Sequence, residues 1–311
     1  MSEIRTVAVV GAGTVGAGWA AWFALHGMEV RVYDAHEPTR RTVAATVRGH
    51  LQRLVDLGLA DPAPVAAAQL RVVESLEEAA SGADLVQESV LETYEAKKAV
   101  FRGLDACTPP DTLLASSSSG LLISEIQPVM GHPERALMVH PFNPPYLIPL
   151  VELVGGPATS PETIERARRF FSAHGKEPVV LHREIPGHLA NRLAAALWRE
   201  AIELVAQGVA TVEDVDTALR AGPGLRWAVM GQHMIYHLGG GQGGYAYFID
   251  HIGKAFEQYW QTMPTWSAIP AEARQAIVAG VEAASHGRTL PELAEERDRK
   301  LAAVLKALRS A

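Results

Sequence analysis

The sequence is poor in cysteine, in excess basic charge and in long apolar runs. Its 311 residues include a single cysteine, Cys107, which excludes an intrachain disulfide and a zinc site built on several thiolates. Lys and Arg number 28 against 35 Asp and Glu, so the net charge of −7 argues against a nucleic-acid or anionic-membrane surface. No stretch approaches the roughly 20 apolar residues that span a bilayer, and the N-terminus lacks a secretory signal. These absences predict a soluble, cytoplasmic protein.

The composition is that of a globular enzyme-sized chain. Hydrophobic residues make up 48% and charged residues 20%, and the length suggests about two domains. In the first half, short apolar runs alternate with helical patterns, which predicts a parallel sheet covered by helices. The expected strands are residues 6–10, 29–33, 84–87, 112–115, 136–139 and 178–181, with a helix over 15–26.

The pattern changes after Pro186-Gly187. From His188 onward, Ala, Leu, Glu and Arg recur at helical spacing, interrupted mainly by glycine-rich stretches. The sequence therefore predicts an α/β, Rossmann-type doubly wound domain over residues 1–185 and an all-α domain over residues 186–311.

A glycine motif of the form G-x-G-x-x-G follows the first predicted strand and opens the first predicted helix. An acid, Asp34, ends the next predicted strand, which is the context that dinucleotide binding requires. Asp34 would accept hydrogen bonds from the adenosine ribose and favour NAD over NADP, although Arg40 and Arg41 lie close enough to leave that preference open. A glycine-rich turn that binds nothing is the alternative. The cofactor-binding residues expected here are Gly11, Gly13, Thr14, Val15, Gly16 and Asp34.

A histidine and a carboxylate suggest an acid–base pair. His140 ends a predicted strand at the carboxyl edge of the sheet, where ligands bind in open α/β folds. Glu152 lies in an apolar run, residues 149–154, where a buried carboxylate needs a partner. Histidine suits proton transfer near neutral pH, and a carboxylate would orient it. Read alone, a histidine before proline is more often structural, and Glu152 could be an ordinary ion-pair partner.

These motifs together resemble the L-3-hydroxyacyl-CoA dehydrogenase superfamily over nearly the whole chain, including its branch of carnitine and L-gulonate 3-dehydrogenases. The resemblance rests on the glycine motif at 11–16, SSSSG at 116–120, HPFNPP at 140–145, LVELV at 150–154 and PGHLANRL at 186–193. The chain departs from the family at His188, where phenylalanine is usual.

The resemblance implies an NAD-dependent dehydrogenase that oxidises the 3-hydroxyl of a short L-3-hydroxy acid in a cleft between the domains, and a homodimer. It makes His140 the general base and Glu152 its orienting partner, with Ser119 and Asn191 near the substrate oxygen. It also implies cofactor contacts from Glu92, Lys97, Ser119 and Asn143. The alternatives are a short-chain 3-hydroxyacyl-CoA dehydrogenase, an L-gulonate 3-dehydrogenase, and a non-catalytic NAD-binding structural protein of the lens-crystallin type.

The second half carries the hints about substrate. The stretch from Gly222 to Gly231 resembles the Gly-Leu-Arg-Trp stretch of the carnitine and gulonate branch, and Arg226 in it suits a free carboxylate. A surface or ion-pairing arginine is the alternative. Trp198 and Trp227 could belong to an aromatic cage for a trimethylammonium group, or simply to the core. L-carnitine is therefore the favoured substrate.

Two further patterns in the second half remain open. His233 and His237 are four residues apart on an expected helix, but no third ligand accompanies them, so we expect no metal. The glycine-rich stretch from Gly239 to Gly244 fits either a mobile lid or a simple loop between helices.

Overall fold

The computed structural model describes residues 4–309. The chain divides into two compact units, residues 1–192 and 193–311, and each is described by itself. The division falls inside helix α7 (Ala190–Ala206), seven residues beyond the predicted end of the first domain at 185. The boundary between 185 and 186 stays a prediction.

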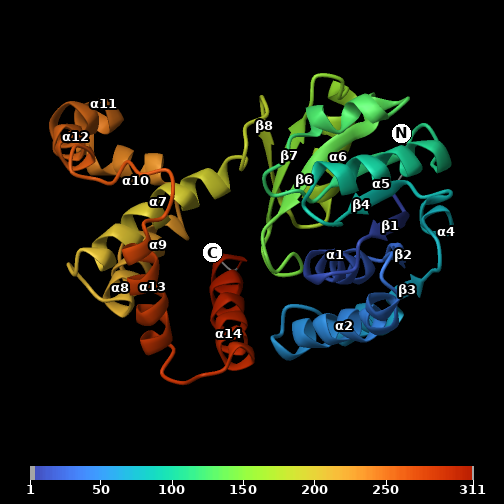
Figure 1. The fold of residues 1–311 in the computed structure, drawn as a ribbon, viewed down its shortest axis with the longest axis horizontal. Coiled ribbons are helices and arrows are strands. Elements are labelled where there is room, and N and C mark those ends of the chain that lie inside the picture. The colour runs from blue at the N-terminus through green and yellow to red at the C-terminus, as the bar shows by residue number, and fades with distance from the viewer. Residues whose placement is uncertain (1–3, 310–311) are drawn as a thin grey trace. The chain divides into compact units, whose positions relative to one another are not determined.

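The first unit is built around one eight-stranded sheet (Figure 1). Its strands lie in the order β3-β2-β1-β4-β5-β6-β7-β8. Their bounds are β1 Thr6–Val10, β2 Glu29–Tyr33, β3 Gln69–Val72, β4 Leu85–Glu88, β5 Leu113–Ser116, β6 Ala136–Pro141, β7 Leu150–Gly155 and β8 Glu177–Leu181. The order of the first six is that of a doubly wound dinucleotide-binding sheet, so the predicted fold class is confirmed.

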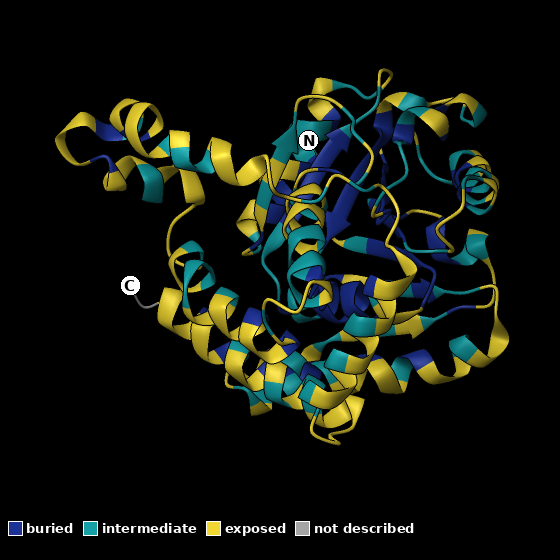
Figure 2. Cartoon of the chain, turned by 60° about the vertical axis from the view of Figure 1, so that its left-hand side comes forward, coloured by how far each residue is buried: buried dark blue, intermediate teal, exposed yellow. Residues whose placement is uncertain are grey.

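Helices cover both faces of this sheet (Figure 2). On one face, α1 (Thr14–Leu25), α2 (Glu37–Asp56), α3 (Pro62–Ala67) and α6 (Pro161–Ala173) pack against it. On the other face lie α4 (Leu76–Ala80), α5 (Tyr94–Cys107) and the short 3₁₀ turns after β5 (Ile123–Glu125, Gln127–Val129 and Pro133–Arg135). Strands β4 and β5 are buried throughout, as expected for central strands with helices on both sides.

Strand direction reverses once in the sheet. Strands β1 to β6 are parallel, but β7 runs antiparallel to β6, and β8 is parallel to β7. The link from Pro141 to Leu150 is too short to contain a crossover helix, so the chain turns back on itself. This reversal places His140 directly opposite Glu152 in the register.

The second unit is entirely helical within the described residues, as predicted. It contains most of α7, then α8 (Val212–Ala221), α9 (Pro223–Trp227), α10 (Gln232–Gly239), α11 (Gly244–Phe248), a π-helical turn (Ile249–Gly253), α12 (Lys254–Trp260), α13 (Ala271–Ala284) and α14 (Leu290–Arg309). The stretch from Gly239 to Gly244 is the end of α10, a 3₁₀ turn (Gly241–Gly243) and the start of α11. Over residues 4–309, no helix combines the length and apolarity needed to cross a membrane.

Candidate active site

The glycine motif forms the turn between β1 and α1. Gly11 has a left-handed φ of +92°, and a Cβ there would lie 2.5 Å from the Ser89 backbone, so only glycine fits. A Cβ at Gly16 would lie 1.8 Å from the Gly11 carbonyl oxygen, whereas nothing lies within 4 Å of a Cβ at Gly13. The turn is therefore closed on the protein side and open at Gly13.

Helix α1 begins at this turn with its first N–H groups free for an anion. Gly13 is the N-cap and provides no side-chain cap, and the first turn holds no acidic side chain. Free N–H groups and the helix dipole make such a terminus a phosphate site. Because β1 and β4 are the strands at which the sheet order switches, the turn lies where dinucleotides bind. The residues present therefore fit the pyrophosphate of NAD.

Asp34 lies just after β2 and is held by backbone donors. Its Oδ2 accepts from the Ala12 N–H at 2.7 Å and its Oδ1 from the His36 N–H at 2.8 Å. Arg40 donates to the Asp34 carbonyl at 2.6 Å and pairs with Glu74 at 3.1 Å, while Arg41 pairs with Glu37. The carboxylate is thus fixed beside the glycine turn, where a ribose hydroxyl would meet it, and both arginines are already engaged by the protein.

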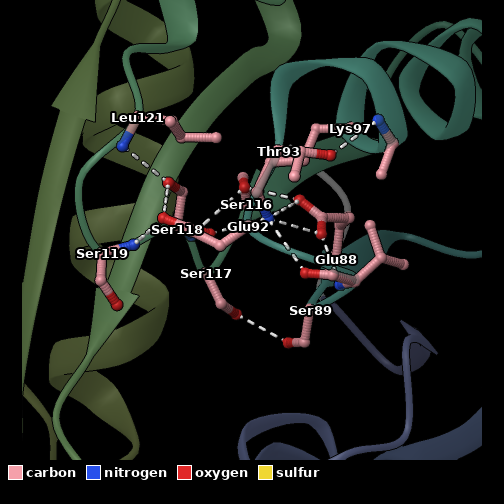
Figure 3. Close-up of polar contacts among 12 residues, drawn as sticks. Glu88, Ser89, Glu92, Thr93, Lys97, Ser116, Ser117, Ser118, Ser119 and Leu121 are labelled. Carbon is pink, nitrogen blue, oxygen red and sulfur yellow. Dashed lines mark hydrogen bonds and ion pairs between the residues drawn. The ribbon is translucent and has the colours of Figure 1, made fainter.

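Glu88, Glu92 and Lys97 form a charged cluster at the end of β4 (Figure 3). The buried Lys97 ammonium lies 2.9 Å from Glu88 Oε1 and 3.3 Å from Glu92 Oε2. Glu88 is fully buried and also accepts from the Ser116 hydroxyl at 2.6 Å. Burial raises the pKa of Glu88, against the opposing effects of Lys97 and Ser116. Lys97 is placed to hold the two glutamates, and Glu88 was not predicted from the sequence.

Glu92 anchors the loop of residues 117–120 that follows β5, here called the serine loop. Its Oε1 accepts from the Ser118 hydroxyl at 2.5 Å, from the Ser119 N–H at 2.8 Å and from the Gly120 N–H at 3.2 Å (Figure 3). Burial opposes ionisation, but these donors and Lys97 together lower the pKa of Glu92. The carboxylate therefore stays charged and fixes the loop, leaving Ser119 exposed.

His140 and Glu152 form a buried pair. His140 Nδ1 lies 2.8 Å from Glu152 Oε2, and the side chains are 3% and 1% exposed. The other oxygen, Oε1, accepts from the N–H groups of Leu189 at 2.9 Å and Ala190 at 2.8 Å. Burial raises the pKa of Glu152, but the bonds from His140, Ala190 and Leu189 outweigh it and lower the pKa.

The ionised carboxylate fixes the tautomer of the histidine. A carboxylate only accepts, so His140 Nδ1 carries the proton of the shared hydrogen bond. In the neutral ring Nε2 then keeps its lone pair and can take a proton. The pair has the arrangement of a general base and its orienting acid.

Residues 187–191, here called the α7 turn, connect this pair to the serine loop. Gly187 and His188 are both left-handed, with φ of +78° and +50°, which directs the next two N–H groups to Glu152. The His188 ring is 1% exposed, lies 5.1 Å from the His140 ring and has Nε2 3.0 Å from the Ser118 carbonyl. Asn191 Nδ2 donates to the Ser119 carbonyl at 3.1 Å.

Lys176 is a buried lysine that the sequence analysis did not single out. Its ammonium donates to the carbonyls of Pro145 and Ile148, in the link between β6 and β7. It lies 5.0 Å and 5.2 Å from the ring centres of Trp19 and Trp22 in α1. Burial lowers the pKa of Lys176 to about 7. Lys176 thus fastens the link that carries Asn143, whose own side chain is exposed.

In the second unit, Arg226 lies on α9 and is exposed. Within residues 4–309, no carboxylate pairs with its guanidinium. Trp198 on α7 is 57% exposed, and Trp227 is half-buried. The unpaired arginine and the exposed indole of Trp198 are available to a ligand, and the half-buried Trp227 is partly so. Within the described residues, Trp198 and Trp227 are not in ring contact.

Both histidines of α10 form hydrogen bonds with Tyr245. His233 Nδ1 lies 2.8 Å from the Tyr245 hydroxyl, and His237 Nδ1 accepts from the Tyr245 N–H at 3.0 Å. Among residues 4–309, no group of three His, Cys, Asp or Glu side chains could hold a metal ion. These histidines fasten α10 to the start of α11.

Comparison with known families identifies the chain. The model of the 3-hydroxyacyl-CoA dehydrogenase NAD binding domain matches residues 6–185, and that of the 3-hydroxyacyl-CoA dehydrogenase C-terminal domain matches residues 187–276. The chain belongs to the 3-hydroxyacyl-CoA dehydrogenase family. It is accordingly an NAD-dependent oxidoreductase that acts on a CH–OH group, as the resemblance of its motifs implied.

Individual relatives cover nearly the whole chain. L-carnitine dehydrogenase of Streptomyces coelicolor is 42% identical over 98% of this chain and 95% of its own. L-carnitine dehydrogenase of Pseudomonas putida is 39% identical over 100% of this chain and 96% of its own. A solved structure of 5-formyl-3-hydroxy-2-methylpyridine 4-carboxylic acid 5-dehydrogenase, described as an NAD⁺-dependent dismutase, has a TM-score of 0.84 at 31% identity and covers 99% of both chains.

Proposed function

We propose that this protein oxidises the 3-hydroxyl group of a short L-3-hydroxy acid carrying a free carboxylate, with L-carnitine as the favoured substrate. The observation that carries the proposal is the buried His140–Glu152 pair, in which Glu152 accepts from His140 Nδ1 and so directs Nε2 of the neutral ring to act as the base. The carnitine dehydrogenases that resemble it over 95% and 96% of their own length support this choice of substrate.

In the proposed reaction, His140 Nε2 takes the proton of the substrate hydroxyl, and Glu152 stabilises the imidazolium that forms. When bound, NAD would supply the acceptor for the hydride that leaves the carbinol carbon, and the product would be the 3-keto acid. Ser119 and Asn191 hold the substrate oxygen, and the serine loop that carries Ser119 is fixed by Glu92. In the reverse direction the protonated His140 returns its proton to the developing oxyanion.

We further propose roles for the remaining predicted residues. Gly11, Gly13, Thr14, Val15, Gly16 and Asp34 bind the pyrophosphate and ribose, and Glu92, Lys97, Ser119 and Asn143 complete the cofactor site, with Lys97 acting through the glutamates that it holds. Arg226 binds the substrate carboxylate, and Trp198 and Trp227 contact its cationic end. The pyridine carboxylic acid in the name of the relative of known structure agrees with a site for a carboxylate.

We also propose that residues 1–185 and 186–311 act as the cofactor and substrate domains of a cytoplasmic homodimer. Large apolar side chains are exposed throughout the helical unit, which is typical of a surface that another subunit covers. They include Leu193, Leu225, Val229, Leu238, Trp260 and Val281. Sedimentation showing only monomer at micromolar concentration would contradict the dimer.

The experiment that tests the function is a substrate screen of the purified protein. NADH formation is measured with L-carnitine, L-gulonate, 3-hydroxybutyrate and 3-hydroxybutyryl-CoA, and we expect the highest kcat/KM with L-carnitine. A preference for the CoA thioester would replace the free acid as substrate. If the protein bound NADH but acted on none of the four compounds, the structural-protein alternative would hold.

Replacement of Arg226 by methionine tests the carboxylate site. A hydrogen-bonded charge contributes about 1.5–3 kcal/mol, so R226M should raise KM for the acid roughly tenfold to a hundredfold. The KM for NAD should not change. R220M, at another exposed arginine six residues earlier on α8, is the matched control. An unchanged KM in R226M would remove Arg226 from the site.

A further inference from the structure

His188 makes contacts that a packing residue would not need. Its ring is buried, and the Ser118 carbonyl at 3.0 Å only accepts, so His188 Nε2 must carry the ring proton. Burial, partly offset by the Ser118 bond, lowers the pKa of His188, and the ring is therefore neutral near pH 7. Its Nδ1 then presents a buried lone pair that no donor within residues 4–309 reaches.

The α7 turn contacts each element that carries a proposed catalytic side chain. Its backbone N–H groups at Leu189 and Ala190 hold Glu152 on β7. The ring of His188 lies against the ring of His140 on β6, with 5.1 Å between the ring centres. The turn therefore orients the base from one side and its carboxylate partner from the other.

The same turn is bonded to the serine loop at two successive carbonyls. His188 bonds to the Ser118 carbonyl at 3.0 Å, and Asn191 bonds to the Ser119 carbonyl at 3.1 Å. On its other side the loop is held by Glu92, through the Ser118 hydroxyl and the Ser119 N–H. The loop is thus fixed between a carboxylate and the α7 turn.

We propose that His188 is a positioning residue that ties the serine loop to the His140–Glu152 pair through its Nε2–H bond to Ser118. This inference rests on the proposed function, since it assumes that His140 is the base and that Ser119 holds the substrate oxygen. Phenylalanine, the usual residue of the family here, could pack on His140 but has no proton to donate. In this chain the Nε2–H group of His188 directly links the loop that carries Ser119 to the His140–Glu152 pair.

Two variants separate the ring from the donor. H188F keeps an aromatic ring against His140 but loses the bond, whereas H188Q keeps an amide donor near the position of Nε2 and loses the ring. One such bond, with the burial of an unpaired carbonyl, corresponds to about a tenfold effect, so H188F should lower kcat by about that factor. KM for NAD should change little, and H188Q should recover most of the loss. H182F, at an exposed histidine six residues earlier, is the matched control and should behave as the wild type.

The outcomes are decisive in both directions. Wild-type kcat in H188F, or an equal loss in H188Q, would overturn the role of the donor. If H188F does not fold, H188N replaces it, because asparagine tolerates the left-handed φ of +50° but is too short to reach Ser118. A folded H188N with wild-type kcat would overturn the proposal equally.

A spectroscopic measurement tests the bond without activity. In protein with ¹⁵N-labelled histidine, we expect the His188 ring to give a neutral signal with its proton on Nε2, assigned by its loss in H188F and its persistence in H182F. A proton on Nδ1 of His188 would contradict the inference. An inactive wild type would instead refute the proposed function while leaving this signal in place, so the two failures are distinguishable.

Discussion

Replacing Glu152 by glutamine tests the assignment of the general base most directly. Glu152 accepts three hydrogen bonds, two from backbone N–H groups and one from His140 Nδ1. In E152Q the amide oxygen can still accept from the two N–H groups of the α7 turn. The amide N–H₂ group then faces His140 Nδ1, which must accept a hydrogen bond from it. The ring proton therefore moves to Nε2. The ring keeps its place but loses its lone pair toward the substrate.

The expected magnitude follows from the role of the lost base. General acid–base catalysis by a positioned side chain contributes about 10²–10⁴-fold, and a wrong tautomer forfeits most of it, so kcat should fall by that range. Binding of NADH should be unchanged, because the glycine turn lies on other elements of the sheet. The assay is NADH formation under saturating substrate, together with NADH fluorescence titration.

The control is E177Q, at an exposed carboxylate at the start of the neighbouring strand β8. If E152Q kept kcat within about threefold of the wild type, the pair could not supply general-base catalysis of the expected size. A loss confined to KM for NAD would equally refute the assignment.

The stability of the wild type relative to E152Q also depends on pH. Because the folded-state pKa of Glu152 lies below its ordinary value, its contribution is present above about pH 4.5 and is lost as the pH falls through the folded-state pKa.

Two further predictions concern the rest of the first unit. Burial brings the pKa of Lys176 to about 7 from an ordinary 10.5, so between these values the unfolded chain binds more protons, and stability rises with pH. Urea unfolding should show this rise, at most about 1.4 kcal/mol per pH unit, in the wild type and not in K176M; equal slopes would contradict it. G16A should lower both the melting temperature and NADH affinity, because its Cβ would lie 1.8 Å from the Gly11 oxygen. G13A, with nothing within 4 Å, should lower the affinity alone, and normal binding by G13A would remove the pyrophosphate from this turn.

The sequence predicted the strands of the sheet wherever burial produced an apolar run. β1 and β2 have the predicted bounds, and β4 and β5 begin one residue later than predicted. The missed strand is β3, Gln69–Val72, whose residues alternate between exposed and half-buried. It lies at the edge of the sheet, where one side is solvent, so polar residues such as Gln69 and Arg71 replace the continuous apolar run.

The candidate site was predictable as far as its motifs and no further. His140 and Glu152 could be paired from the sequence, but the register that aligns them depends on the reversal between β6 and β7. The eight residues between these strands were the available signal, since a parallel connection needs a dozen or more. Glu88 also had a signal in the sequence, because it places a charge inside the buried run of β4. Such a charge required a buried cation, which is Lys97.

The contacts of the α7 turn could not be read from the sequence because they are long-range and pass through backbone atoms. Glu152 is held by N–H groups 37 and 38 residues away, and His188 bonds to a carbonyl 70 residues away. Nearly every residue has a backbone N–H and a carbonyl, so the residue type at these positions does not indicate these bonds. The one local sign is Gly187, whose left-handed φ of +78° begins the turn. Catalytic side chains in this fold are therefore named by sequence motifs, while their relative positions are set by backbone groups that only the folded chain brings together.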